Sequence, residues 1–140
     1  MRKIISLALL MVLIMSCHRT VDYAYGVGLN IKNNSSHTIK VSLTDAELPW
    51  GGKTYEIKAN DEFIVKESVD GIPELTIYTA SICFDSEIEA VYTISGDSSQ
   101  YNVCNNDNWI VEKDEYSTMW TYTFTEEDFE YAKSQSSSDY

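Results

Sequence analysis

The sequence predicts an all-β fold, namely an antiparallel β-sandwich (Ig-like or transthyretin-like) of seven to eight short strands with a short C-terminal helix. Apolar and polar residues alternate with a period of two from Gly26 onward, which is the pattern of half-buried strands. Clusters of turn residues interrupt this alternation at short intervals, and one acidic segment near the C-terminus has the form of a helix start. The 140 residues are enough for one domain and too few for two ordinary ones.

The clearest local pattern is a pair of alternating runs around one polar cluster. Apolar residues alternate with small or polar ones at 27–31 and again at 39–43, on either side of Asn33-Asn34-Ser35-Ser36. Two such runs around a short polar turn predict an antiparallel hairpin.

Branched and aromatic residues mark the remaining strands. Six further strands are expected at 55–57, 63–65, 75–84, 88–94, 101–104 and 118–124. They are too short and uneven for a closed barrel of eight strands, which favours the sandwich. The segment Thr125-Glu126-Glu127-Asp128 has the form of a capping box and predicts a helix from Glu126 to about Lys133.

The N-terminal segment has the layout of an export signal. Arg2 and Lys3 precede an apolar run at 4–15 that would be roughly 18 Å long as a helix, against roughly 30 Å of hydrocarbon. The run ends in Leu13-Ile14-Met15-Ser16-Cys17, which resembles the bacterial lipobox. That resemblance implies that the Cys17 thiol takes a diacylglycerol and that the peptide is cut in front of it. The alternative is an ordinary secreted protein that is cut nearby.

These features divide the chain into four parts. We expect a lipoprotein signal peptide at 1–16, a lipidated tether at 17–25, a β-sandwich domain at 26–133 and a disordered tail at 134–140. More than one acyl chain, such as palmitate, on Cys17 would hold the protein stably on a membrane without a spanning helix. Because His18 rather than Asp follows Cys17, the expected location is the outer membrane, with the leaflet left open.

The charge balance excludes one class of partner. Ten Lys and Arg stand against 22 Asp and Glu, for a net charge of −12. Nucleic-acid affinity rests on cations that neutralise phosphates, so a nucleic-acid partner is excluded. The expected partners are the membrane and an unidentified protein or glycan.

Cysteine usage predicts a disulfide. Cys83 and Cys104 remain after lipidation of Cys17, and an oxidising compartment favours their pairing, although two buried free thiols are the alternative. The chain contains no CxxC motif and no His near either cysteine, so no zinc site is expected. No loop has an EF-hand or another dense Asp pattern for calcium, so no metal or cofactor is assigned.

Few residues have the pattern of catalytic or binding groups. His37 lies in a predicted turn beside two serines, where a nucleophile and its base cannot easily meet, so no catalytic residue is assigned and the protein is expected not to be an enzyme. Trp50 and Trp109 fall in predicted loops, where exposed aromatic side chains can contact a ligand. Trp120 is expected in the core.

Three stretches carry a resemblance to a group of proteins. They are residues 120–132, the segment Cys83-Phe84-Asp85 before a strand, and Tyr101-Asn102-Val103-Cys104 before Trp109. With the lipobox they resemble small uncharacterised outer-membrane lipoproteins of Bacteroidota. The resemblance implies an exported, anchored β-rich domain and brings no activity or site residues with it.

The expected function is therefore that of a non-enzymatic envelope lipoprotein that acts as an interaction or structural module. The alternative is a glycan- or ligand-binding module that uses the loop aromatics Trp50 and Trp109.

Overall fold

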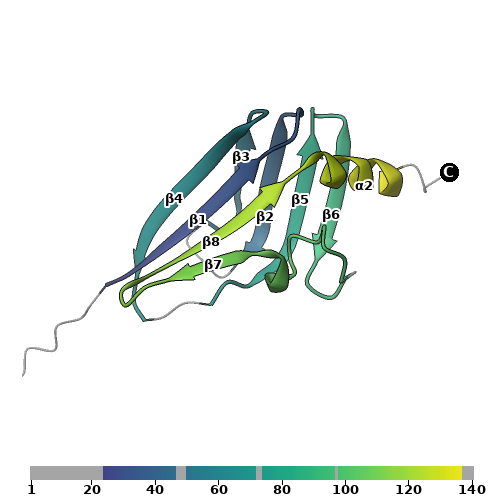
Figure 1. The fold of residues 1–140 in the computed structure, drawn as a ribbon. Helices are drawn as coiled ribbons and strands as arrows, with labels where there is room; N and C mark the ends of the chain where they lie inside the picture. The colour runs from purple at the N-terminus through teal and green to yellow at the C-terminus, as the bar shows by residue number, and fades with distance from the viewer. Residues whose placement is uncertain (1–23, 47–49, 72–73, 97, 137–140) are drawn as a thin grey trace, which may run out of the picture.

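Two four-stranded sheets pack face to face in the computed structural model, which describes residues 24–46, 50–71, 74–96 and 98–136 (Figure 1). The strands are β1 (Tyr25–Asn33), β2 (Ile39–Ala46), β3 (Lys53–Ile57), β4 (Asp61–Val69), β5 (Ile77–Phe84), β6 (Ile88–Thr93), β7 (Ile110–Lys113) and β8 (Ser117–Phe124). One sheet has the order β4-β1-β8-β7 and the other has the order β3-β2-β5-β6. The expected all-β sandwich with a short C-terminal helix is confirmed.

The core lies between the two sheets and follows the period-two pattern. On β8, residues at alternate positions are buried, and on β5 Ala80, Ile82 and Phe84 are buried while their neighbours are partly exposed. Phe84 meets Phe124 of the other sheet edge to face, with ring centroids 6.3 Å apart. Burial of such side chains contributes about 25 cal/mol per Å² of apolar surface and is the main stabilising term of the fold.

The predicted hairpin between β1 and β2 is wrong. The two strands belong to different sheets, and β1 pairs instead with β4 in antiparallel and with β8 in parallel orientation. The polar cluster after β1 is a corner at which the chain passes from one sheet to the other. Two alternating strands around a short turn can either pair edge to edge or stack face to face, and both arrangements need the same sequence pattern.

A buried asparagine holds this corner. Asn33 is fully buried, and its Nδ2 donates to the carbonyl oxygens of His37 (2.7 Å), Lys58 (2.9 Å) and Ile57 (3.2 Å). Its Oδ1 accepts from the backbone N–H and the hydroxyl of Ser35. One side chain thus joins the corner to the end of β3 in the opposite sheet.

The strand predicted at 101–104 is also wrong, because this segment forms turns. Val103 and Cys104 are buried there without any strand pairing. Asn102 organises the segment, since its Oδ1 accepts from the Cys104 N–H (2.9 Å) and its Nδ2 donates to the Thr93 carbonyl (3.1 Å). A short 3₁₀ turn at Asn106–Asn108 then leads into β7.

The expected disulfide between Cys83 and Cys104 is not formed, and both cysteines are free. Cys83 lies between two inward-facing residues of β5, Ile82 and Phe84, so its own side chain points to the outer face of the sheet. Cys104 belongs to the core and is 1% exposed. The two thiols therefore lie on opposite sides of one sheet.

Helix α2 (Glu126–Ser136) begins where the capping box predicts and extends further than expected. The Asp128 carboxylate accepts from the N–H and the hydroxyl of Thr125, both at 2.8 Å, which is the reciprocal half of a capping box. Residues 134–136 are helical rather than part of a disordered tail. At the other end of the domain, β1 starts at Tyr25, inside the expected tether.

The hydrogen bonds at the corner predict that Asn33 contributes much more to the stability of the fold than its neighbour Asn34. Asn33→Ala removes the donor to three carbonyl oxygens and the acceptor for Ser35, and unsatisfied buried groups of this kind cost about 1–3 kcal/mol each. We expect the free energy of unfolding in urea to fall by at least ~2 kcal/mol. The control Asn34→Ala changes an exposed side chain and should stay within ~0.5 kcal/mol of wild type. Equal effects of the two substitutions would contradict the structural role of Asn33.

Candidate functional site

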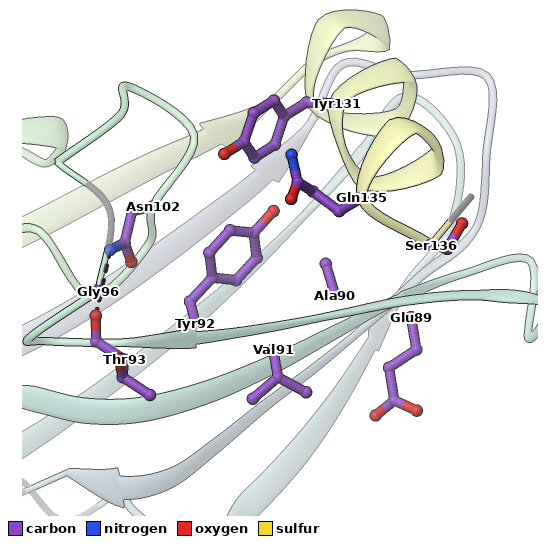
Figure 2. Close-up of a pocket in the computed structure, with 10 residues that line it drawn as sticks. All are labelled: Glu89, Ala90, Val91, Tyr92, Thr93, Gly96, Asn102, Tyr131, Gln135 and Ser136. Carbon is purple, nitrogen blue, oxygen red and sulfur yellow. Dashed lines mark hydrogen bonds between the residues drawn. The ribbon is translucent and has the colours of Figure 1, made fainter. Parts of the chain in front are cut away.

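A groove lies between β6 and the C-terminal half of α2 (Figure 2). Its volume is about 410 Å³, within the range of ligand-binding clefts. Strand, loop and helix all contribute to its lining: Glu89, Ala90, Val91, Tyr92, Thr93, Gly96, Asn102, Tyr131, Gln135 and Ser136.

The packing of α2 against β6 creates this groove. Ala132 is fully buried on the side of the helix that meets the sandwich. Tyr131 stacks on Tyr101 with ring centroids 4.6 Å apart, which fixes one face of its ring. In Figure 2 the Tyr92 hydroxyl points from the strand toward Tyr131 and Gln135 of the helix. The groove thus combines aromatic surface with amide and hydroxyl groups.

The floor of the groove is an edge strand, because β6 is the last strand of its sheet. Ile94 N–H donates to the Tyr78 carbonyl, so the residues at 88, 90 and 92 direct their backbone groups toward β5 and those at 89, 91 and 93 direct theirs outward. The outward carbonyl of Thr93 accepts from Asn102 Nδ2 and from Gly96 N–H. Within the described part of the chain, the outward backbone groups of Glu89 and Val91 have no such partner.

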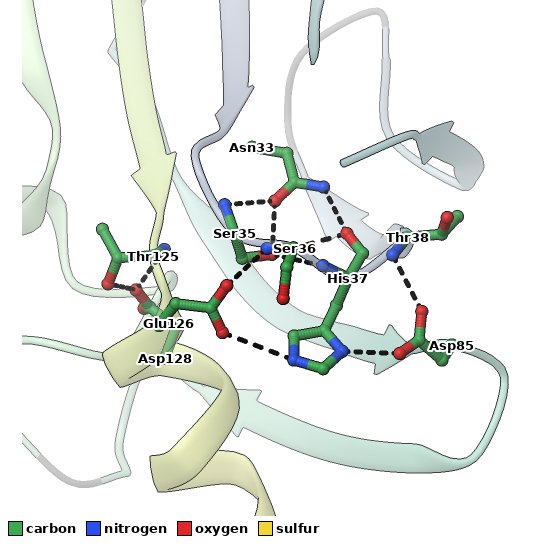
Figure 3. A network of polar contacts seen from close by, with 9 residues as sticks. All are labelled: Asn33, Ser35, Ser36, His37, Thr38, Asp85, Thr125, Glu126 and Asp128. Carbon is green, nitrogen blue, oxygen red and sulfur yellow. Dashed lines mark hydrogen bonds and ion pairs between the residues drawn. The ribbon is translucent and has the colours of Figure 1, made fainter. Parts of the chain in front are cut away.

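A second cluster surrounds His37 on the corner between β1 and β2 (Figure 3). Its Nδ1 lies 2.5 Å from Asp85 Oδ2 in the β5–β6 turn, and its Nε2 lies 3.3 Å from Glu126 Oε2 at the start of α2. The ring stacks on Phe129 of the helix, with centroids 3.6 Å apart and planes at 17°. His37 therefore clamps three separate segments together rather than standing in a free turn.

Backbone donors complete the carboxylate contacts of this cluster. Asp85 Oδ1 accepts from Thr38 N–H at 2.8 Å, and Glu126 Oε1 accepts from Ser36 N–H at 2.5 Å. The hydrogen bond from His37, followed by the one from Thr38, lowers the pKa of Asp85. The bond from Ser36 N–H is the main cause of the lowered pKa of Glu126.

The geometry around His37 does not assemble a nucleophile and a base. Both ring nitrogens face carboxylate oxygens, and Phe129 covers one face of the ring. The hydroxyl of Ser35 donates to Asn33 Oδ1 at 2.7 Å instead of to the imidazole. This arrangement stabilises a junction between secondary-structure elements.

The ligand-contact role expected for Trp50 and Trp109 is wrong, because both side chains are buried. Trp50 is 0% exposed and meets Trp120 edge to face, with ring centroids 6.3 Å apart. Trp109 is 5% exposed, and its Nε1 donates to the Val103 carbonyl at 2.8 Å. Neither ring can stack on a sugar without unfolding its surroundings, so the alternative glycan-binding hypothesis loses its site.

The polar residues 105–108 before Trp109 predict an exposed loop. Their amides instead bond to backbone carbonyls: Asn106 Nδ2 donates to Leu75 at 2.7 Å, and Asn108 Nδ2 donates to Ser99 and Asn102, both at 2.9 Å. The loop is thereby tied down over the tryptophan, and its polar composition reflects internal hydrogen bonding.

The cysteines are the remaining candidate site residues. Burial raises the pKa of Cys104 to about 11, which keeps its thiol protonated and unreactive near neutral pH. Cys17 lies outside the described residues. Among the residues that the structure describes, no three His, Cys, Asp or Glu side chains are grouped to hold a metal ion. In the same part of the chain, no helix has the length and apolar character needed to cross a membrane.

Comparison with known proteins leaves the chain without an assigned family. No family model and no curated protein matches it. One solved structure that it resembles is the dioxygenase domain of a dioxygenase carbohydrate-binding protein fusion from the cellulolytic bacterium Streptomyces sp. SirexAA-E. The identity is 6%, the TM-score is 0.38, and the match covers 76% of this chain and 82% of that one. A similarity at this level supports no conclusion about activity.

The carboxylates near α2 predict two opposite pH dependences. Asp85 has a lowered pKa, so its contribution to stability is present above the unfolded value near 4 and is lost as the pH falls through the folded value. Burial is the main cause of the raised pKa of Asp128, so wild type gains stability relative to an uncharged variant as that carboxylate protonates.

We expect the stability difference between wild type and Asp85→Asn to shrink as the pH falls from about 5 to about 2. The free energy of unfolding of wild type should instead rise relative to that of Asp128→Asn as the pH falls from about 6 to about 4. Urea unfolding at a series of pH values measures both. If the stability difference between wild type and variant changes with pH in the same direction for both variants, these electrostatic assignments are wrong.

Proposed function

We propose that this chain is the precursor of a lipoprotein of the bacterial outer membrane, and that its β-sandwich acts by binding another protein rather than by catalysis. The observation that carries the proposal is the groove beside β6, where an edge strand with outward backbone groups lies next to aromatic and amide side chains. Unpaired sheet edges bind other chains readily, and folded proteins usually protect them.

The lipobox-like segment that ends at Cys17 supports the membrane anchor. The arrangement of the sandwich is compatible with such a tether. The start of β1 pairs with the start of β8, whereas α2 follows the end of β8, so the described chain begins at the end of the sandwich remote from the helix (Figure 1). A tether at that end would leave the groove open to a partner.

The surroundings of the reactive side chains support a binding role over an enzymatic one. His37 is engaged by two carboxylates and by Phe129, and the Cys104 thiol is buried with its pKa raised to about 11. Both are thereby occupied in structural contacts.

Metabolic labelling with palmitate tests the anchor. We expect wild type to incorporate the label into the membrane fraction and Cys17→Ala to lose it, because the thiol is the group that takes the diacylglycerol, which carries the labelled acyl chains. Cys83→Ala is the matched control and should label like wild type. Label that persists in Cys17→Ala would refute lipidation at this residue.

Photo-crosslinking in cells tests the binding role. A benzophenone amino acid replaces Val91 on the edge of β6, and in the control it replaces Val111, an exposed valine on the edge strand β7. We expect a discrete protein adduct at position 91 that is at least several-fold stronger than at position 111. No adduct, or equal adducts at both positions, would contradict a binding surface at β6.

A further inference from the structure

We propose that the groove takes an extended, cationic peptide segment, which adds to β6 as a fifth strand of the β3-β2-β5-β6 sheet. This inference rests on the proposed binding function and specifies the chemistry of the partner. An extended segment can satisfy the backbone groups at a sheet edge, while pockets beside the edge select its alternate side chains.

The backbone of β6 defines where such a segment would pair. Glu89 and Val91 direct their N–H and carbonyl groups away from β5, and no hydrogen bond to these groups exists within residues 24–46, 50–71, 74–96 and 98–136. Thr93 ends the free edge, because its carbonyl already accepts from Asn102 Nδ2. The added strand would therefore be short and centred on Val91.

The groove would receive the side chains that point toward the helix. Ala90 and Tyr92 lie on the same face of β6 as α2, and Tyr131 and Gln135 face them from the helix (Figure 2). A volume of about 410 Å³ with two aromatic rings suits apolar side chains at alternate positions of the segment. The other side chains would lie beside Glu89 and Val91 on the outer face of the sheet, where Val91 is 64% exposed.

Charge selects a cationic segment. Among the described residues that line the groove, Glu89 is the charged one. Glu127 and Glu130 are exposed on α2 and share a neighbouring hollow with Tyr131, which also lines the groove. The whole chain carries a net charge of −12, so a second copy would be repelled and a lysine-bearing strand would be attracted.

The other edge strands lack this combination. β3, at the opposite edge of the same sheet, has five residues with Lys53 and Glu56 exposed, and β4 carries exposed charged residues along its length. β7 has only four residues and ends in Glu112 and Lys113. Charged and short edges of this kind discourage strand pairing. β6 is the edge that has an exposed valine at its centre and a helix beside it.

Peptide binding to the full-length protein tests the inference. The probe is a fluorescent peptide of alternating Lys and Val, and its control alternates Glu and Val. We expect the Lys peptide to bind at least about tenfold more tightly. Two further Lys peptides are N-methylated, one at every Lys amide and the other at every Val amide. Only alternate amides of a strand face its neighbour, so one of these peptides should bind at least about tenfold more weakly than the unmethylated peptide and the other should stay within about threefold of it.

Variants of the protein provide the matched comparison. Val91→Pro removes one outward N–H at a position where an edge strand tolerates proline, and it should weaken binding by roughly tenfold, whereas Val91→Ala keeps the N–H and should retain more of the affinity. Glu89→Lys should abolish the preference for the Lys peptide, and Glu112→Lys makes the same charge change on β7 and should preserve it. Urea unfolding of each variant verifies that the fold is intact.

Several outcomes would overturn the inference. Equal tolerance of both N-methylated sets would exclude strand pairing, and equal effects of Glu89→Lys and Glu112→Lys would show general charge attraction. A concentration-dependent dimer that Val91→Pro abolishes would assign the edge to a second copy. If cross-links at position 91 persist in any of these cases, the binding function stands and only the recognition mode is wrong. If the Lys peptide binds with the expected N-methylation pattern but no cross-links form in cells, the recognition mode is right and the proposed binding function is wrong.

Discussion

The buried amide of Asn33 is the constraint on which the two-sheet arrangement depends. Its three donated hydrogen bonds and its acceptance from Ser35 satisfy the backbone at the point where the chain leaves one sheet for the other. Without such a side chain, buried carbonyl oxygens would remain unpaired at the corner, which the interior tolerates poorly. The same corner presents His37 to the helix and to the β5–β6 turn, so the placement of α2 depends on it as well.

Much of the fold could be predicted from residue patterns. Alternation located most of the strands, and the acidic cap located the start of α2, because both signals arise from neighbours in sequence. The pairing of β1 could not be predicted in this way. Face-to-face stacking and edge-to-edge pairing of two amphipathic strands bury the same residues, so the choice between them depends on long-range contacts of Asn33 with the end of β3.

The candidate site was less accessible to prediction from sequence. Trp50 and Trp109 have polar or flexible neighbours, but internal hydrogen bonds and ring packing bury them, and the sequence carries no signal for those contacts. The alternation of β5 does predict that the Cys83 side chain points away from the side that Ile82 and Phe84 face. The burial of Cys104 on the inner side of the sheet depends on turns that the sequence pattern does not reveal. The groove itself unites residues of β6 with residues of α2 that are about forty positions later, and only the docking of the helix brings them together.

The order of the strands along the chain would have a consequence for the export that we propose. Strands β2, β3, β5 and β6 lie within residues 39–93, so one sheet can assemble from a contiguous part of the chain. The other sheet needs β8 in its interior, where Gly26 pairs with Ser117, 91 positions later. A polypeptide that is threaded through a translocation channel from its N-terminus would have to deliver nearly all of its length before that sheet could close. Such distant pairing is slow to form, which keeps the chain compatible with passage in an unfolded state.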